Sequence, residues 1–341
     1  MKKVMVTGAG GYIGSVLVGQ LLERGHQVVA LDRFFFGERT LGAWRDHPHL
    51  RLVKQDIRDL TPGELEGMDV VCDLAAFSND PSGDLDPELT REVNWRGRVR
   101  VAHMSKQAGV RQYILASSCS VYGQSDTDRD VEESAPTNPL TVYARSNLDA
   151  ERDVFPLSDG HFRVTALRKG TVFGQSPRMR FDLVINLMTL HAVQKGRIMV
   201  TGGGRQWRPL VHVADVARAY LAVMDADPSQ VEGQVFNIGA LNARVLGLAY
   251  TVRETLPFNL EINVATDDPD KRDYRVSFAK AARQIGFRTE KSVADGVREI
   301  YEALKQGDVD TGLRSVTVKW YRHLLEAQQL LQEITLNGRY L

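Results

Sequence analysis

The sequence is poor in cysteine and carries no net charge, and both absences exclude classes of protein. The 341 residues include only Cys72 and Cys119, too few for a disulfide scaffold or a cysteine-based zinc site, so a reducing compartment is expected. Scattered histidines and carboxylates show no metal-ligand spacing, so no metal is expected. The 43 lysines and arginines balance 43 aspartates and glutamates. Without a basic field or a dense basic run, nucleic acid is not an expected partner.

Long apolar runs are also missing from the sequence. No stretch approaches the roughly 20 apolar residues that a membrane-spanning helix needs. The first apolar run, at residues 4–6, is too short for the hydrophobic region of a signal peptide. We therefore expect a cytoplasmic protein with no membrane partner.

The first half of the chain alternates short β-rich runs with longer helical patterns. Strands are predicted over residues 4–6, 27–31, 50–54, 70–73, 113–116 and 164–167, and helices over 12–24, 88–108 and 143–154. Strands separated by helical crossovers form right-handed βαβ units, which give a parallel sheet covered on both faces. The pattern predicts an α/β protein with a doubly wound parallel sheet, the Rossmann fold.

The second half has a looser pattern and is predicted to be a smaller α/β lobe. It contains a predicted helix over 181–195, a strand over 197–200, a glycine turn at 202–204, a helix over 213–225 and a final helix over 316–334. A loop rich in proline and acidic residues is expected over 126–139. The predicted division is a Rossmann domain at 1–175, a smaller lobe at 176–310 and a C-terminal helical segment at 311–341.

A glycine-rich loop follows the first predicted strand and opens the first helix. Gly8 permits a tight turn, Gly11 lets backbone N–H groups approach a pyrophosphate, and Gly14 lets the helix pack closely on the sheet. The helix N-terminus then faces the phosphates with its positive dipole end. In this strand, turn and helix context, the loop predicts a dinucleotide site.

Acidic residues after the second and third strands refine this prediction. Asp32 follows Gly14 by 18 residues, and a carboxylate there accepts hydrogen bonds from the adenosine ribose and repels a 2′-phosphate. It therefore favours NAD over NADP, a preference that the neighbouring Arg33 weakens. Asp56 either accepts a hydrogen bond from the adenine amine or forms a turn or a cap.

Taken together, these motifs resemble the extended short-chain dehydrogenase/reductases, a family of nucleotide-sugar epimerases, dehydratases and reductases. The resemblance covers about residues 3–306 and rests on the glycine loop, on Asp32 and Asp56, on residues 73–76, Asn94 and 117–123, on Tyr143 and on 208–216. It implies a nucleotide-sugar substrate and an NAD site formed by Gly8, Gly11, Tyr12, Ile13, Gly14, Asp32, Arg33, Asp56, Ile57, Leu74, Ala75, Ala76, Asn94, Ser117, Tyr143 and Asn147.

In enzymes of this family a tyrosine and a lysine four residues later lie on one helix face, and a serine or threonine binds the reacting oxygen. The resemblance makes Ser118 the hydroxyl partner and Tyr143 the acid/base. The lysine position is Asn147, and a neutral amide can bind a ribose but supplies no charge that lowers the pKa of the phenol.

Three interpretations of Asn147 are open. Lys169, on the sixth strand, could place an ammonium group near the same site and contact the cofactor, although an exposed lysine at a strand end is the competing interpretation. Arg145 is two residues from Tyr143 and points to another helix face. Alternatively, the chain binds NAD with weak or lost catalysis.

The two residues after Ser118 distinguish branches of the family. The 4,6-dehydratases that this chain resembles carry an Asp-Glu pair there for water elimination, and decarboxylating relatives also carry a glutamate. This chain has Cys119 and Ser120, and neither is a carboxylic acid, so a 4-epimerase or a ketoreductase is favoured over a dehydratase. We interpret Cys119 as a small buried residue.

The resemblance also indicates where a nucleotide sugar would bind. Arg208 and Arg272 match the positions that hold the diphosphate, and Asn186 matches an amide that contacts it; guanidinium groups suit phosphate oxygens. Ser78 and Asn79 follow the fourth strand at the edge where ligands of such folds bind, and either face the sugar or form a turn. Ser118 and Ser120 complete this substrate set. We interpret His212 as a core histidine.

The leading hypothesis is an NAD-dependent nucleotide-sugar epimerase acting at C4, with Tyr143 as the acid/base and Ser118 polarising the reacting oxygen. A first alternative is an NAD(P)H-dependent reductase of a 4-keto nucleotide sugar. A second, of another class, is an NAD-binding module with weak or lost catalysis. The family resemblance also implies a homodimer through the helices near 88–108 and 140–154.

Overall fold

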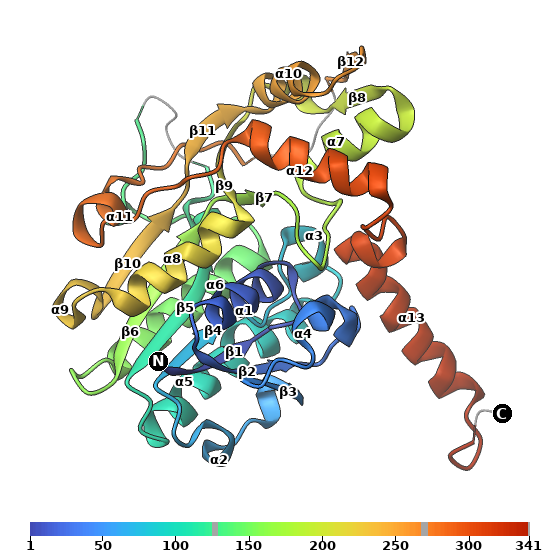
Figure 1. Cartoon of the computed structure of the whole chain (residues 1–341). Helices are drawn as coiled ribbons and strands as arrows, with labels where there is room; N and C mark the ends of the chain where they lie inside the picture. The colour runs from blue at the N-terminus through green and yellow to red at the C-terminus, as the bar shows by residue number, and fades with distance from the viewer. Residues whose placement is uncertain (125–128, 267–271, 340–341) are drawn as a thin grey trace.

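The computed structural model describes residues 1–124, 129–266 and 272–339, and it contains the expected Rossmann fold (Figure 1). Among the described residues, seven parallel strands form the main sheet in the order β10-β6-β5-β4-β1-β2-β3. Their bounds are β1 Lys3–Thr7, β2 Gln27–Asp32, β3 Leu50–Lys54, β4 Val70–Asp73, β5 Gln112–Ser118, β6 Arg163–Lys169 and β10 Gln234–Ile238. The doubly wound α/β class is therefore confirmed.

Helices cover both faces of the sheet, because successive side chains of each buried strand point to opposite faces. On β1, Val4 and Val6 belong to the core beneath α1 (Tyr12–Glu23) and α8 (Val213–Asp225). Met5 belongs to the core beneath α5 (Arg98–Gln107) and α6 (Val142–Val154). The strands are apolar on both faces, as expected for a parallel sheet between two helical layers.

The smaller lobe lies beyond the carboxyl edge of the sheet (Figure 1). A three-stranded sheet has the order β11-β9-β7, and β12 pairs with β8. The lobe elements are β7 Thr171–Phe173, α7 Val184–Lys195, β8 Arg197–Val200, β9 Trp207–His212, β11 Leu241–Arg244, α10 Val245–Thr255, β12 Glu261–Val264, α11 Ala279–Gln284 and α12 Val293–Gln306.

The remaining short elements connect these layers or begin loops. They are η1 Glu38–Trp44, η2 Ile57–Asp59, α2 Pro62–Leu65, α3 Asp80–Gly83, α4 Pro87–Arg91, η3 Glu92–Gly97, η4 Cys119–Tyr122, η5 Phe155–Leu157, η6 Gly202–Gly204, α9 Pro228–Val231 and η7 Leu313–Ser315. None of the helices in the described part of the chain combines the length and apolar character that crossing a bilayer requires.

Two features differ from the expectation. The chain does not leave the Rossmann domain at residue 175, because α8 packs on α1 and β10 pairs with β6 of the main sheet. The helix predicted over 88–108 consists of α4, the π-helical η3 and α5 in succession. Of the predicted loop over 126–139, residues 126–128 lie outside the described residues.

The final helix, α13 (Thr317–Ile334), confirms the helical pattern at the end of the chain. Its first turns pack on the body, with Tyr321 only 9% exposed, and its last turns extend away from it (Figure 1). The Trp320 indole donates a hydrogen bond to the Phe35 carbonyl at 2.8 Å. The helix is therefore anchored on the loop that follows β2.

A buried ion pair joins α6 to β6 and generates a stability prediction. The Arg168 guanidinium donates to the Glu151 carboxylate at 2.6–3.2 Å, and both side chains are less than a tenth exposed. Glu151→Ala leaves a buried charge without its partner and should lower the free energy of unfolding by about 3–5 kcal/mol, measured by urea titration. Arg152→Ala, at an exposed neighbouring position, should change it by less than about 1 kcal/mol. Equal effects would contradict this account.

Candidate active site

A cavity of about 780 Å³ lies along the carboxyl edge of the main sheet, between the sheet, the smaller lobe and α13. Ligands of doubly wound folds bind at this edge. The cavity brings together most of the residues predicted from the sequence: Gly8, Gly11, Tyr12, Ile13, Gly14, Asp32, Arg33, Asp56, Ile57, Leu74, Ala75, Ala76, Ser78, Asn79, Ser118, Ser120, Tyr143, Asn147, Lys169, Arg208 and Arg272.

The glycine loop forms a cradle that side chains would fill. Gly8 has a φ of +67°, and a Cβ on it would lie 2.8 Å from the Ala75 backbone nitrogen. A Cβ on Gly14 would lie 2.1 Å from the Gly8 carbonyl oxygen, so the first turn of α1 packs directly on the loop. The loop backbone is thereby exposed to the cavity at a helix N-terminus, which suits a pyrophosphate.

Asp32 lies at the end of β2, where the sequence places a ribose-binding carboxylate. Its oxygens accept hydrogen bonds from the backbone N–H groups of Gly10 at 2.9 Å and Phe34 at 2.6 Å. Burial raises the pKa of Asp32, while these hydrogen bonds and the nearby Arg178 lower it. The carboxylate is fixed in place and lines the cavity.

Asp56 is chiefly a cap and an ion-pair partner. Its carboxylate accepts from the Arg58 backbone at 2.9 Å and from the Arg58 guanidinium at 2.8–2.9 Å. Arg33 donates to the same carboxylate at 3.1 Å. Of the two roles open for Asp56, this geometry favours the cap, because the arginines already occupy its oxygens.

Ser118 and Tyr143 both line the cavity, and their side chains form a hydrogen bond. Ser118 ends β5, and its hydroxyl accepts from the Ser120 N–H at 3.1 Å. Tyr143 lies in the first turn of α6, which Thr141 caps by accepting from the Ala144 N–H at 3.1 Å. Burial raises the pKa of Tyr143 and Asp80 raises it further, whereas Ser118, Arg180 and Arg98 lower it.

Lys169 also lies in the cavity, so the interpretation of an exposed lysine is wrong. It ends β6 directly opposite Ser118 in the strand register. No hydrogen bond or ion pair joins its amine to another residue within the described ranges. Burial, and then the Arg98 charge, lower the pKa of Lys169 to about 7. Both effects favour the neutral form of this amine.

Three predicted ligand residues lie behind the cavity wall instead of in it. Asn94 exchanges two hydrogen bonds with the Phe77 backbone, at 2.8 and 3.0 Å. Ser117 donates to Glu151, and the Asn186 amide bonds to Tyr12, Arg180 and Gly174 at 2.9–3.1 Å. The side chains of all three hydrogen-bond to the protein, and none of the three lines the cavity.

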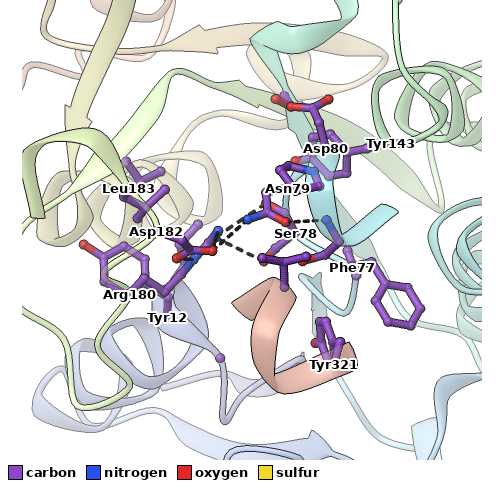
Figure 2. Close-up of a pocket in the computed structure, with 18 of the residues that line it drawn as sticks. Tyr12, Phe77, Ser78, Asn79, Asp80, Tyr143, Arg180, Asp182, Leu183 and Tyr321 are labelled. Carbon is purple, nitrogen blue, oxygen red and sulfur yellow. Dashed lines mark hydrogen bonds and ion pairs between the residues drawn. The ribbon is translucent and has the colours of Figure 1, made fainter. Parts of the chain in front are cut away.

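Arg208 and Arg272 are brought together on the lobe side of the cavity. The Arg208 guanidinium donates to the Arg272 carbonyl at 2.5 Å and to the Trp207 carbonyl at 2.8 Å. Arg272 forms an ion pair with Asp80, whose carboxylate also accepts from Thr141. The sequence motifs missed Asp80, which lies beside Tyr143 (Figure 2).

Ser78 and Asn79 hold a buried ion pair that also was missed from the sequence (Figure 2). Arg180 and Asp182 form two parallel hydrogen bonds of 3.0 Å. The Arg180 guanidinium donates to the Ser78 hydroxyl at 3.1 Å, and the Asn79 amide donates to Asp182 at 2.7 Å. The loop after β4 is thereby tied to the segment that enters the smaller lobe.

Arg178 and Tyr321 close the part of the cavity near Asp32. Arg178 stacks over Phe36 at 3.7 Å and donates to the Thr317 hydroxyl at 2.9 Å. Burial lowers the pKa of Arg178 to about 10, and burial raises the pKa of Tyr321 to about 12. Tyr321 packs edge-on against Phe77, with ring centroids 4.9 Å apart.

Arg98 is a further site residue that the sequence motifs missed. It is fully buried and donates to the Asn147 side-chain oxygen at 3.1 Å. It follows Asn94 by one helical turn, and residues with that spacing share a helix face. That spacing is the signal that could have found it.

Cys119 and His212 are enclosed, as interpreted from the sequence. The Cys119 thiol donates to the Arg168 carbonyl at 3.2 Å, and burial raises the pKa of that thiol. The His212 ring accepts from the Ala214 N–H at 3.2 Å and bonds to Glu299 at 2.8 Å. In the described part of the chain, no group of three or more histidine, cysteine or acidic residues is arranged to hold a metal.

The family of the chain follows from a match over its first two thirds. Residues 4–239 match the model of the NAD dependent epimerase/dehydratase family. The chain belongs to that family, which confirms an NAD-dependent enzyme of the extended short-chain dehydrogenase/reductase type. The glycine cradle and the Asp32 carboxylate fit the NAD that the family requires.

Individual relatives are distant but cover nearly the whole chain. UDP-glucuronic acid decarboxylase 1 of Xenopus tropicalis is 26% identical over 308 residues, or 87% of this chain and 71% of the relative. The structure of MoeE5 in complex with UDP-glucuronic acid and NAD is 27% identical, covers 89% of this chain and 99% of that one, and has a TM-score of 0.78. A dTDP-glucose 4,6-dehydratase from Streptomyces venezuelae with NAD bound is 26% identical, covers 90% and 98%, and has a TM-score of 0.80.

The glycine cradle gives a prediction for cofactor binding. Gly14→Ala forces the loop away from α1 and should weaken NAD binding by more than about tenfold, measured by isothermal titration calorimetry. Gly247→Ala is the control, because a Cβ on this helical glycine meets nothing within 4 Å. It should leave NAD affinity unchanged and raise stability by up to about 1 kcal/mol. Unchanged affinity in Gly14→Ala would contradict the cradle.

The low pKa of Lys169 gives a prediction for stability against pH. Between about pH 7 and the ordinary pKa of 10.5, the unfolded chain binds a proton that the folded chain lacks, so stability rises with pH. Lys169→Met should therefore raise the free energy of unfolding by about 2–4 kcal/mol at pH 7 and below. The gain should fall toward zero near pH 10.5. Denaturant titrations across this range measure it, the exposed Lys319→Met is the control, and a constant gain would refute the shift.

Proposed function

We propose that this protein is an NAD-dependent nucleotide-sugar epimerase that inverts the sugar at C4 through a transient keto sugar. The proposal rests on Ser118 and Tyr143, which are paired in the cavity. Neither of the two residues that follow Ser118 has a carboxyl group. The pair can move a proton on a sugar hydroxyl. Cys119 and Ser120, the two residues after Ser118, offer no carboxylic acid that could assist loss of water or carbon dioxide from the sugar.

Proton transfer is assigned to Tyr143, and orientation of the reacting oxygen to Ser118. The tyrosine phenolate takes the proton of the sugar hydroxyl, and the serine hydroxyl hydrogen-bonds to the same oxygen. Burial opposes ionisation of the phenol, and Arg180 and Arg98 favour it. The positive groups around Tyr143 are therefore part of its activation.

NAD would be held by the glycine cradle, by Asp32 and by the loop at Leu74 and Ala75. When bound, NAD would supply the hydride acceptor for the sugar carbon and the hydride that restores this carbon from the opposite face. Asp32 supports NAD in preference to NADP, because a carboxylate repels a 2′-phosphate. A cofactor that starts and ends each turnover oxidised suits an epimerase.

A nucleotide sugar is supported by the arginines on the lobe side of the cavity. Arg208 and Arg272 can form paired hydrogen bonds to diphosphate oxygens. Three related proteins are consistent with this class, since their names or complexes contain UDP-glucuronic acid or dTDP-glucose.

Dehydration and decarboxylation are disfavoured at this site, although relatives carry out such reactions by name. The Cys119 thiol is fully buried and faces the Arg168 carbonyl. Ser120 reaches the cavity but is a poor acid. Asp80, the carboxyl group near Tyr143, is held by Arg272 and Thr141.

A reductase of a 4-keto nucleotide sugar is the second candidate. Arg33 and Arg58 meet at Asp56 beside the cavity, and both could face a 2′-phosphate. Such an enzyme would consume added NADH or NADPH when given a keto sugar.

An NAD-binding module without turnover is the third candidate, because Asn147 stands where enzymes of the family have a lysine. As a further part of the proposal, α5 and α6 would form the interface of a homodimer.

The product distinguishes these reactions directly. Purified protein incubated with UDP-glucuronic acid or UDP-glucose, without added reductant, should yield a C4 epimer of unchanged mass. NMR spectroscopy identifies the inverted carbon, and mass spectrometry detects any loss of carbon dioxide or water. A pentose or a dehydrated product would replace the epimerase by a decarboxylase or a dehydratase.

The two hydroxyl groups give a mutational prediction for the same reaction. Tyr143→Phe should lower kcat by at least about 100-fold, because it removes the acid/base, and Ser118→Ala should lower it by about tenfold or more. The exposed Tyr250→Phe is the matched control and should retain full activity. Steady-state rates with the best nucleotide sugar measure the effect. Full activity of Tyr143→Phe would remove Tyr143 from the mechanism.

A further inference from the structure

The residue at the lysine position, Asn147, is buried, and both ends of its side-chain amide form hydrogen bonds within the protein. It is 2% exposed. Its side-chain oxygen accepts from Arg98 at 3.1 Å, and its side-chain nitrogen donates to the Tyr143 carbonyl at 2.9 Å. Because a guanidinium only donates hydrogen bonds, the amide oxygen must face Arg98 and the nitrogen must face Tyr143. Asn147 therefore connects the tyrosine turn to a buried cation.

That cation is held from three further directions. The Arg98 guanidinium donates to the Asp73 side chain and carbonyl, both at 3.3 Å, and to the Ala116 carbonyl. Asp73 is fixed in turn by Thr7 at 2.5 Å and by the Tyr113 hydroxyl. These contacts hold the charge at the ends of β4 and β5. The β5 contact, Ala116, is two residues before Ser118.

Burying the Arg98 charge costs desolvation free energy, and the charge acts on Tyr143 and Lys169. Desolvating an ion pair costs several kcal/mol, which good geometry only partly offsets. The Arg98 charge lowers the pKa of both Tyr143 and Lys169. Burial also lowers the pKa of Lys169, whereas an arginine keeps its charge throughout the physiological range. Of the two, Arg98 is the constant source of positive field.

We propose that Arg98, acting through Asn147, takes over the electrostatic role that a lysine four residues after the tyrosine has in enzymes of this family. Arg98 is a positioning residue: it contacts Asn147 and the sheet edge and does not need to touch the substrate. The inference rests on the proposed acid/base role of Tyr143. It makes residues 98 and 147 a coupled pair.

Coupling predicts that a lysine at position 147 conflicts with Arg98. Asn147→Lys replaces the acceptor of the Arg98 hydrogen bond by a second cation about 3 Å away. In the double variant Arg98→Met/Asn147→Lys the buried region again contains one cation beside Asp73. The double variant should therefore be more stable than Asn147→Lys alone, by urea titration. Additive losses from the two changes would refute the coupling.

The ionisation of Tyr143 provides a readout that a merely structural arginine would not affect. Charged and titratable groups around the phenol are Asp80 on α3, Arg180 before α7, Arg98 on α5, Lys169 on β6 and Tyr220 on α8. Carbon-13 labelling of tyrosine, with Tyr143 assigned through Tyr143→Phe, allows NMR titration of this residue in NAD-loaded protein without substrate. Arg98→Met should move the titration upward by about one pH unit or more, and the double variant should restore it.

The exposed Arg100→Met on the same helix is the matched control and should leave the titration unchanged. The pH profile of turnover should follow the titration of Tyr143. At neutral pH the turnover rate of Arg98→Met should therefore fall about tenfold, and that of the double variant should recover to within about threefold of the unaltered protein.

If Arg98→Met does not fold, Asn147→Lys and the double variant still decide the matter through stability and titration. A Tyr143 titration independent of residue 98 would overturn the inference. A titration that depends on residue 98, in protein that turns over no sugar, would sustain it and reject the epimerase.

Discussion

The buried ion pair between Asp73 and Arg98 ties together the elements that carry the chemistry. Asp73 ends β4, Arg98 begins α5, and their hydrogen bonds reach β5 at Ala116 and α6 at Asn147. Removing one partner would leave an uncompensated buried charge, so the pair strongly constrains how these elements pack. The position of Tyr143 follows from that packing, because Asn147 holds its backbone carbonyl.

The zero net charge of the chain hides a strongly polarised cavity. Phosphate groups can meet backbone N–H groups at the glycine cradle on one side and the Arg208 and Arg272 guanidiniums on the other. The Arg180 and Asp182 pair links the two sides through the loop after β4. In the proposed function a neutral protein binds two anionic ligands, because the relevant charges are local and partly enclosed.

Local patterns predicted the fold and several of the residues that line the cavity. The glycine loop and the strand ends act through neighbours in sequence, so Gly14 and Asp32 could be assigned from spacing alone. Arg98 and Asn147 are 49 residues apart and meet only in the packed structure. The same holds for Tyr321 and the residues around Phe35, which α13 reaches from the other end of the chain. Asn94, Ser117 and Asn186 do not line the cavity, and hydrogen bonds to distant parts of the chain, which no motif indicates, hold their side chains.

In the proposed function, a chain without lysine at position 147 still performs hydride chemistry because Arg98 supplies the charge. The most direct test follows a nucleotide sugar carrying deuterium at C4 through turnover by the unaltered protein. The proposed epimerase should invert C4 and retain its deuterium, with no exchange into solvent. Unchanged sugar in the presence of protein saturated with NAD would contradict it and would leave a cofactor-binding module in place of an epimerase.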